Sequence, residues 1–133
     1  MRLAVYAVPT DTIYDVGSKI IGYDVKEEQV LEITDAIIQP FVGEAHKYGI
    51  HGTLKGLFTP TDLNDVIDEL CAIALSTEAF TLTNSRIEGF GNRILFIGFD
   101  SSPNLLKLHV QVLERMNKVR KQLIEPEYDR PYT

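Results

Sequence analysis

The order of hydrophobic and polar positions divides the first third of the chain into a short strand and a short helix. Residues 3–8 form an apolar run that a proline terminates, which predicts a buried strand at the start of the domain. Residues 12–23 favour a short helix that ends near Gly22. Residues 24–40 show helical spacing that a second proline stops, so this segment predicts a loop with a helical turn.

The segment at residues 48–58 (YGIHGTLKGLF) has the most informative pattern, because its polar and apolar residues alternate with period two. Such alternation predicts a strand. Three polar side chains, His51, Thr53 and Lys55, then share one face, which predicts a polar cleft, while the other face packs against a core. The opposite set consists of Ile50, Gly52 and Leu54.

Two longer segments carry apolar residues at helical spacing and predict amphipathic helices. The first is expected over residues 61–76, with Thr61 as its N-cap and an aspartate next to it at the positive end of the helix dipole. The second begins at Ser102, which a proline follows, and ends before Pro126. The two apolar stripes are Leu63, Val66, Ile67, Leu70, Ile73 and Ala74, and Leu105, Leu108, Val112, Met116, Val119 and Leu123.

Between these helices the pattern predicts two paired strands, at residues 80–87 and 93–100, with a glycine-containing turn at residues 88–92. The second strand is strongly apolar, which is typical of a central strand. The order of all elements indicates an α+β fold in which helices cover one face of a mostly antiparallel sheet.

Length and composition favour one domain over residues 1–133, because the hydrophobic share of 44 % and the charged share of 24 % are ordinary for globular proteins. No apolar run approaches the roughly 20 residues of a membrane span, and the start lacks the apolar region of a signal peptide. We therefore expect no membrane association and a cytoplasmic location. Cys71, the one cysteine, excludes an internal disulfide and is expected in the core. We expect neither a metal nor another cofactor.

The net charge of −6 argues against a broad nucleic-acid-binding face, because such binding neutralises many phosphates. Any phosphate recognition must therefore be local. One basic patch fits this requirement, because His46, Lys47, His51 and Lys55 lie within ten residues that contain no acid.

The sequence His51-Gly52-Thr53-Leu54 resembles the H-x-T-hydrophobic signature of the two-histidine (2H) phosphoesterases, the LigT-like class of 2′-5′ RNA ligases and cyclic phosphodiesterases. The surrounding order of elements is similar too, so the resemblance covers nearly the whole chain. Residues 17–24 (GSKIIGYD) and 48–58 look like the corresponding segments of a branch of unknown function that is associated with phosphonate-utilisation genes. The resemblance implies a bilobal 2H fold, of which this chain would be the amino-terminal part with an incomplete second lobe.

In that family, two such motifs face each other across a groove and act on a 2′,3′-cyclic phosphate or a related phosphodiester without a metal. One group removes a proton from the nucleophile and another protonates the leaving oxygen, and histidine suits both tasks near neutral pH. A threonine two residues further on can donate to a phosphoryl oxygen as charge builds there. The resemblance thus implies catalytic roles for His51 and Thr53, with Lys55 as an electrostatic neighbour.

Three more residues near the motif are candidates for substrate contact. Tyr48 precedes the motif on the same segment. Tyr6, on the first strand, either faces the cleft or fills the core. His46 either contacts substrate or lies in a solvated loop, and His109 is expected to be a partly buried helix residue.

The chain contains one H-x-T motif where the family has two. The second is expected either from a continuation of the chain, which we favour, or from a two-fold homodimer that sets His51 of one chain opposite His51 of another. The expected partners are a small phosphodiester, a nucleotide or an RNA end. Two alternatives remain open, namely a non-catalytic nucleotide- or RNA-binding module with one half-site, and a structural or interaction domain.

Overall fold

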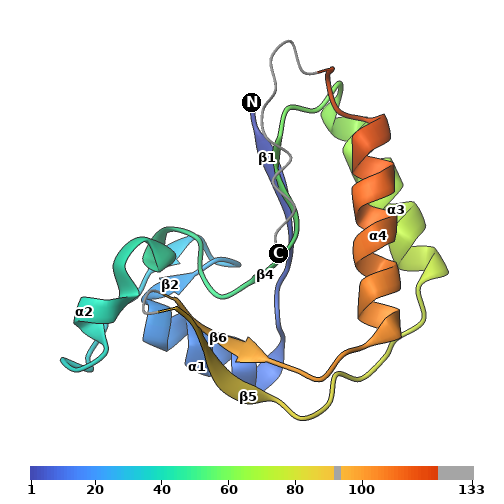
Figure 1. Cartoon of the computed structure of the whole chain (residues 1–133). Coiled ribbons are helices and arrows are strands. Elements are labelled where there is room, and N and C mark those ends of the chain that lie inside the picture. The colour runs from blue at the N-terminus through green and yellow to red at the C-terminus, as the bar shows by residue number, and fades with distance from the viewer. Residues whose placement is uncertain (92–93, 123–133) are drawn as a thin grey trace. The chain divides into compact units, whose positions relative to one another are not determined.

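A computed structural model describes residues 1–91 and 94–122 as α+β structure (Figure 1). The chain divides into two compact units, one formed by Ala4–Gly56 and the other by Met1–Leu3 together with the residues from Leu57 onward. A single domain over residues 1–133 stays a prediction. The elements are β1 Leu3–Ala7, α1 Asp11–Ile21, β2 Tyr23–Asp24, β3 Gln29–Val30, α2 Gln39–Val42, the 3-10 helix η1 Gly43–Lys47, β4 Gly52–Phe58, α3 Leu63–Ser76, β5 Arg86–Phe90, β6 Ile94–Gly98 and α4 Pro103–Lys118.

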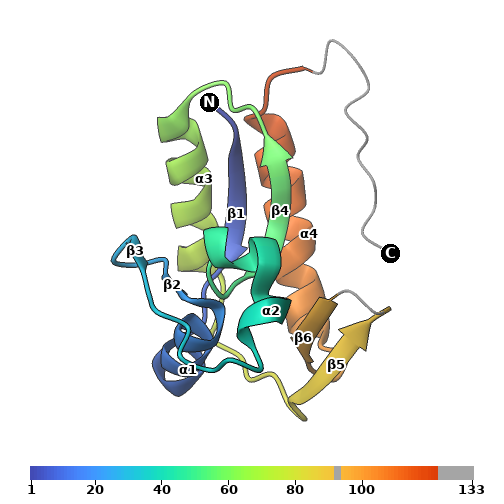
Figure 2. The same ribbon diagram turned by 90° about the vertical axis from the view of Figure 1, so that its left-hand side faces the viewer.

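The described strands form three two-stranded sheets, which pair β1 with β4, β2 with β3, and β5 with β6. The second and third sheets are antiparallel, and β1 and β4 also run in opposite directions (Figure 2). The predicted α+β class with antiparallel pairing is thus confirmed. The described strands are, however, distributed over three small sheets and not over one larger sheet.

Helix α1 confirms the predicted short helix and ends where expected. Gly22 adopts the left-handed conformation with φ 79°, and its amide donates to the carbonyl of Ser18 at 2.8 Å. Gly17, in the middle of the helix, allows Ile50 to approach closely, because a Cβ added there would lie 2.1 Å from the Cδ1 of Ile50. The segment that precedes β4 is therefore packed directly against α1.

A hairpin made of β2 and β3 occupies the part of the chain for which the pattern predicted only a loop and a helical turn. The Asp24 carboxylate holds its turn by accepting from the amides of Lys26 at 3.0 Å and Glu27 at 3.1 Å. The buried Tyr14 of α1 donates its hydroxyl to the same carboxylate. This hydrogen bond lowers the pKa of Asp24, and burial raises the pKa of Tyr14.

In the other unit, α3 and α4 pack side by side (Figures 1 and 2). Val66 and Ile73 of α3 are buried, as are Val112 and Met116 of α4, so these members of the predicted apolar stripes form the core. Leu63, Ile67 and Ala74 of the predicted α3 stripe are exposed, so that stripe is buried only in part. Arg115 of α4 adds a hydrogen-bonded ion pair to Glu69 of α3 at 2.7 Å.

The two helix starts differ in how well the sequence predicted them. Ser102 caps α4 as expected, because its hydroxyl accepts a backbone amide of the first turn at 3.2 Å. The prediction that Thr61 caps α3 is wrong, because Asp62 accepts the corresponding amide at 2.7 Å. Thr61 instead donates its hydroxyl to the carbonyl of Val119 at 2.9 Å. Helix α4 ends before the predicted position, and Leu123 lies outside the described residues.

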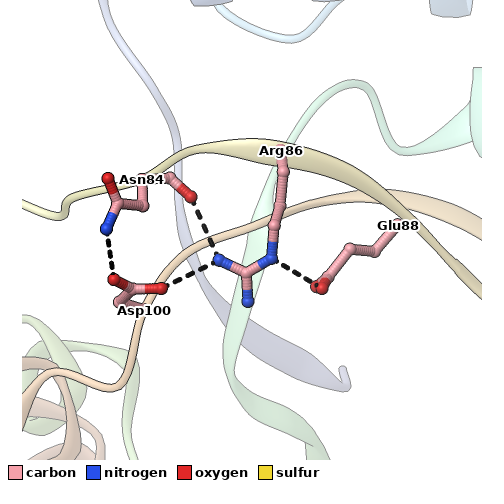
Figure 3. Close-up of polar contacts among 4 residues, drawn as sticks. All are labelled: Asn84, Arg86, Glu88 and Asp100. Atoms are coloured by element: carbon pink, nitrogen blue, oxygen red, sulfur yellow. Dashed lines mark hydrogen bonds and ion pairs between the residues drawn. The ribbon is translucent and has the colours of Figure 1, made fainter.

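Strands β5 and β6 pair as predicted, but β5 begins at Arg86 and not at residue 80. It also continues to Phe90, so residues 88–90 of the predicted turn belong to the strand. Asn84 has a φ of 55°, which interrupts the extended chain before β5. The Arg86 guanidinium donates to Glu88 at 2.8 Å, to the Asn84 carbonyl at 3.1 Å and to Asp100 at 3.0 Å (Figure 3). These contacts tie the start of β5 to the residues that follow β6.

The prediction that the apolar strand is central is wrong for the described part of the chain. There β6 pairs with β5 alone, and 77 % of the Leu95 side chain's surface is accessible. Cys71, expected in the core, is also exposed. Among the described helices, none combines the length and apolar character needed to cross a membrane. The exposed apolar residues of the β5–β6 hairpin are Ile87, Phe90, Ile94, Leu95, Phe96 and Ile97.

Candidate functional site

His51 lies immediately before β4 and is half-buried within the unit Ala4–Gly56. Its Nδ1 atom lies 2.9 Å from the carbonyl oxygen of Gly49. Its ring stacks on Tyr6, with 3.9 Å between the ring centroids and 25° between the planes. The Tyr48 ring lies edge-on to the same imidazole, with 6.4 Å between the ring centroids and 65° between the planes. Two of the predicted substrate-contact residues thus gather around the predicted catalytic histidine.

The hydrogen bond to Gly49 assigns the protonation pattern of the neutral His51 ring. A carbonyl oxygen only accepts hydrogen bonds, so Nδ1 must be the donor. In the neutral form the proton is therefore on Nδ1, and Nε2 carries the lone pair. The Nε2 atom is then the nitrogen that can take a proton from a nucleophile.

Thr53 follows two residues after His51 and is exposed. The predicted strand is confirmed over residues 52–58, whereas residues 48–51 lie outside it. Within β4, alternation places Thr53 and Lys55 on one face. The motif thus spans a junction, with the histidine in the irregular segment and the threonine on the strand.

The two lysines of the predicted basic patch differ in their surroundings. Lys55 is buried, with 8 % of its surface accessible. Lys47 forms an exposed ion pair with Glu44 at 2.6 Å. Their hydrogen bond lowers the pKa of Glu44 and raises the pKa of Lys47. The basic patch is therefore partly neutralised by an acid that lies just before it in the sequence.

The other two histidines have different surroundings. His46 is exposed on η1, where its Nδ1 donates to the carbonyl of Gly43 at 2.6 Å. An exposed ring is compatible with both substrate contact and a solvated position, so the role of His46 stays a prediction. His109 is half-buried on α4, as expected. Among residues 1–91 and 94–122, no three His, Cys, Asp or Glu side chains are grouped so that they could hold a metal ion.

For Gly49, the sequence indicated only that its lack of a side chain lets backbone or ligand approach closely, and it did not indicate the contact with His51. The one signal in the sequence is a glycine two positions before the motif histidine. The contact between its carbonyl and His51 depends on the backbone conformation, which the sequence does not show. Comparisons of the chain with protein-family models, curated proteins and solved structures find no match.

Proposed function

We propose that this chain is a phosphoesterase of the two-histidine, LigT-like class. Its substrate is a 2′,3′-cyclic phosphate, or a related small phosphodiester, nucleotide or RNA end. The observation that carries the proposal is the His51 ring, which is held by Gly49 and Tyr6 with Nε2 carrying the lone pair, two residues before an exposed Thr53. The bilobal 2H fold and a cytoplasmic location belong to the same proposal.

The chemistry assigns one task to each residue of the motif. As water attacks phosphorus, Nε2 of His51 removes its proton, and the bond from phosphorus to the leaving oxygen breaks. The Thr53 hydroxyl donates to a non-bridging phosphoryl oxygen, where negative charge increases in the transition state. A second acid then protonates the leaving oxygen.

The second acid/base group is proposed to come from a further H-x-T or H-x-S motif, because the chain contains one. Further sequence is the favoured source, and His51 of a second copy is the alternative. Without this group, the rate should be lower by on the order of 10²–10⁴. Mixing wild-type protein with His51→Ala protein separates the two sources. Activity strictly proportional to the wild-type fraction rejects a site shared between two copies.

The central experiment compares His51→Ala with wild type on 2′,3′-cyclic nucleotides, measuring both turnover and substrate affinity. We expect turnover to fall by on the order of 10²–10⁴ while affinity is largely kept. His109→Gln is the control, because it changes a histidine on α4, in the other unit, and should keep wild-type turnover.

Two results would contradict a phosphoesterase. If wild-type turnover is no higher than that of His51→Ala, His51 has no catalytic role. A loss of nucleotide affinity in His51→Ala, with no turnover by either protein, would assign the site to a non-catalytic nucleotide- or RNA-binding module.

A further inference from the structure

We propose that Gly49 is a positioning residue for His51, whose backbone carbonyl keeps the neutral imidazole protonated on Nδ1 and presents Nε2 for reaction. The catalytic meaning of this inference rests on the proposed function. The position of the proton, in contrast, is a property of the chain without substrate and can be measured separately.

The Gly49 carbonyl is held in place by a backbone conformation that favours glycine. Its φ is 68°, in the left-handed region that other residues seldom adopt. A Cβ at this position would lie 3.1 Å from the Cβ of Val25 and 3.4 Å from the Cδ1 of Tyr23. Both neighbours belong to the β2–β3 hairpin and the turn that joins its strands. The hairpin thus packs closely against Gly49 on the side where any other residue would place its side chain.

Tyr6 and Gly49 restrain different degrees of freedom of the His51 ring. The stacked Tyr6 ring fixes the imidazole plane, with 25° between the two planes. Rotation of the ring by half a turn within that restraint would exchange the two edges of the imidazole. The Gly49 carbonyl, 2.9 Å from Nδ1, favours the orientation in which that nitrogen faces the backbone. Together the two contacts determine the plane of the imidazole ring and which of its edges faces the Gly49 carbonyl.

His46 offers a matched comparison within the same unit. Its Nδ1 also donates to a glycine carbonyl, that of Gly43, which likewise has a positive φ of 51°. Apart from Gly43 and its two chain neighbours, no atom of the described residues lies within 4 Å of the place where a Cβ on Gly43 would be. The His46–Gly43 hydrogen bond thus has the same local form as the His51–Gly49 hydrogen bond, but it lies at an exposed position. Gly43→Ala consequently serves as the control for Gly49→Ala.

The test is ¹⁵N NMR of the histidine side chains in the full chain, at a pH where the imidazoles are neutral. The nitrogen shifts distinguish Nδ1–H from Nε2–H tautomers. We expect His51 of the wild type to be mainly Nδ1–H. In Gly49→Ala the tautomer ratio should move toward Nε2–H by on the order of twofold to tenfold, the equilibrium equivalent of one hydrogen bond. Gly43→Ala should leave the His51 ratio unchanged.

An Nε2–H tautomer of His51 in the wild type overturns the inference, and this measurement requires no variant. A folded Gly49→Ala protein with an unchanged His51 ratio overturns it as well. Turnover of a 2′,3′-cyclic nucleotide separates the two proposals, because Gly49→Ala should lower kcat with little change in KM. An Nδ1–H tautomer in a wild type without any turnover supports the positioning inference and refutes the proposed function.

Discussion

Replacing Gly17 with alanine places a methyl group at the point where Ile50 packs against α1. The added Cβ would lie 2.1 Å from the Cδ1 of Ile50 and 3.2 Å from its Cβ. Ordinary van der Waals contact begins at 3.4 Å, so the first distance is about 1.3 Å too short. Ile50 must therefore move, and because it adjoins His51 in the sequence the movement reaches the candidate site.

Two effects of opposite sign determine the stability of Gly17→Ala. Forcing an extra methyl group into a packed contact costs about 1–3 kcal/mol. Alanine in a helix interior is favoured over glycine by about 0.5–1 kcal/mol. We expect the first effect to prevail and the free energy of unfolding to fall by about 1 kcal/mol. A loss of this size lowers the Tm of a chain of this length by roughly 3–6 °C.

Urea unfolding followed by circular dichroism measures this loss. Gly89→Ala on β5 is the control, because the nearest atom to its added Cβ among the described residues, chain neighbours apart, would be the carbonyl oxygen of Gly91 at 3.7 Å. That variant should stay within about 0.5 kcal/mol of wild type. Ile50→Val removes the Cδ1 atom, so Gly17→Ala should cost less in the Ile50→Val background than in the wild type.

A Gly17→Ala protein at least as stable as the wild type would show that Ile50 does not lie close to α1. An equal loss in the wild-type and Ile50→Val backgrounds would show that the Cδ1 atom of Ile50 is not the group that the new methyl displaces.

Two further predictions concern the two units separately. Met116→Ala should lower the free energy of unfolding by about 2–5 kcal/mol, because the side chain is completely buried. If urea unfolding shows a loss no larger than that of Leu106→Ala, which changes an exposed residue, Met116 is not part of the core. The hydrogen bond from Tyr14 lowers the pKa of the Asp24 carboxyl group in the folded state. The stabilisation that this contact provides is therefore present above the pKa that Asp24 has in the unfolded state, and it is lost as the pH falls through the pKa of the folded state. Stability measured between about pH 6 and pH 2 should therefore fall less steeply in Asp24→Asn than in wild type, and identical slopes would reject the contribution of this contact.

Local sequence signals predicted α3 and α4 well because both the apolar stripe and the cap depend on neighbouring residues. Ser102 illustrates this for α4, where the hydroxyl meets an amide of the same turn. Thr61 illustrates the limit, because two adjacent residues could cap α3. Its hydroxyl donates instead to Val119, which is distant in the sequence. Which of two possible caps is used therefore depended on tertiary packing.

The strands show where a local pattern is insufficient. An apolar run such as that of β6 suits both a central strand and an exposed hairpin strand, and only the neighbours distinguish them. The strands β2 and β3 contain two residues each, which is too short to show any period. Lys55, which the alternation predicted to face a polar cleft, is buried, because burial depends on tertiary packing and not on strand periodicity.

The sequence by itself determined which side chains carry the proposed chemistry, because a histidine and a threonine two residues apart are read directly from the chain. It also determined the α+β class and most helix positions, since these follow from local periodicity. Only the tertiary structure decided the surroundings of His51. Tyr6 comes from the distant first strand, and the β2–β3 hairpin packs against Gly49. Contacts of this kind depend on how distant segments pack, which no spacing within the motif records.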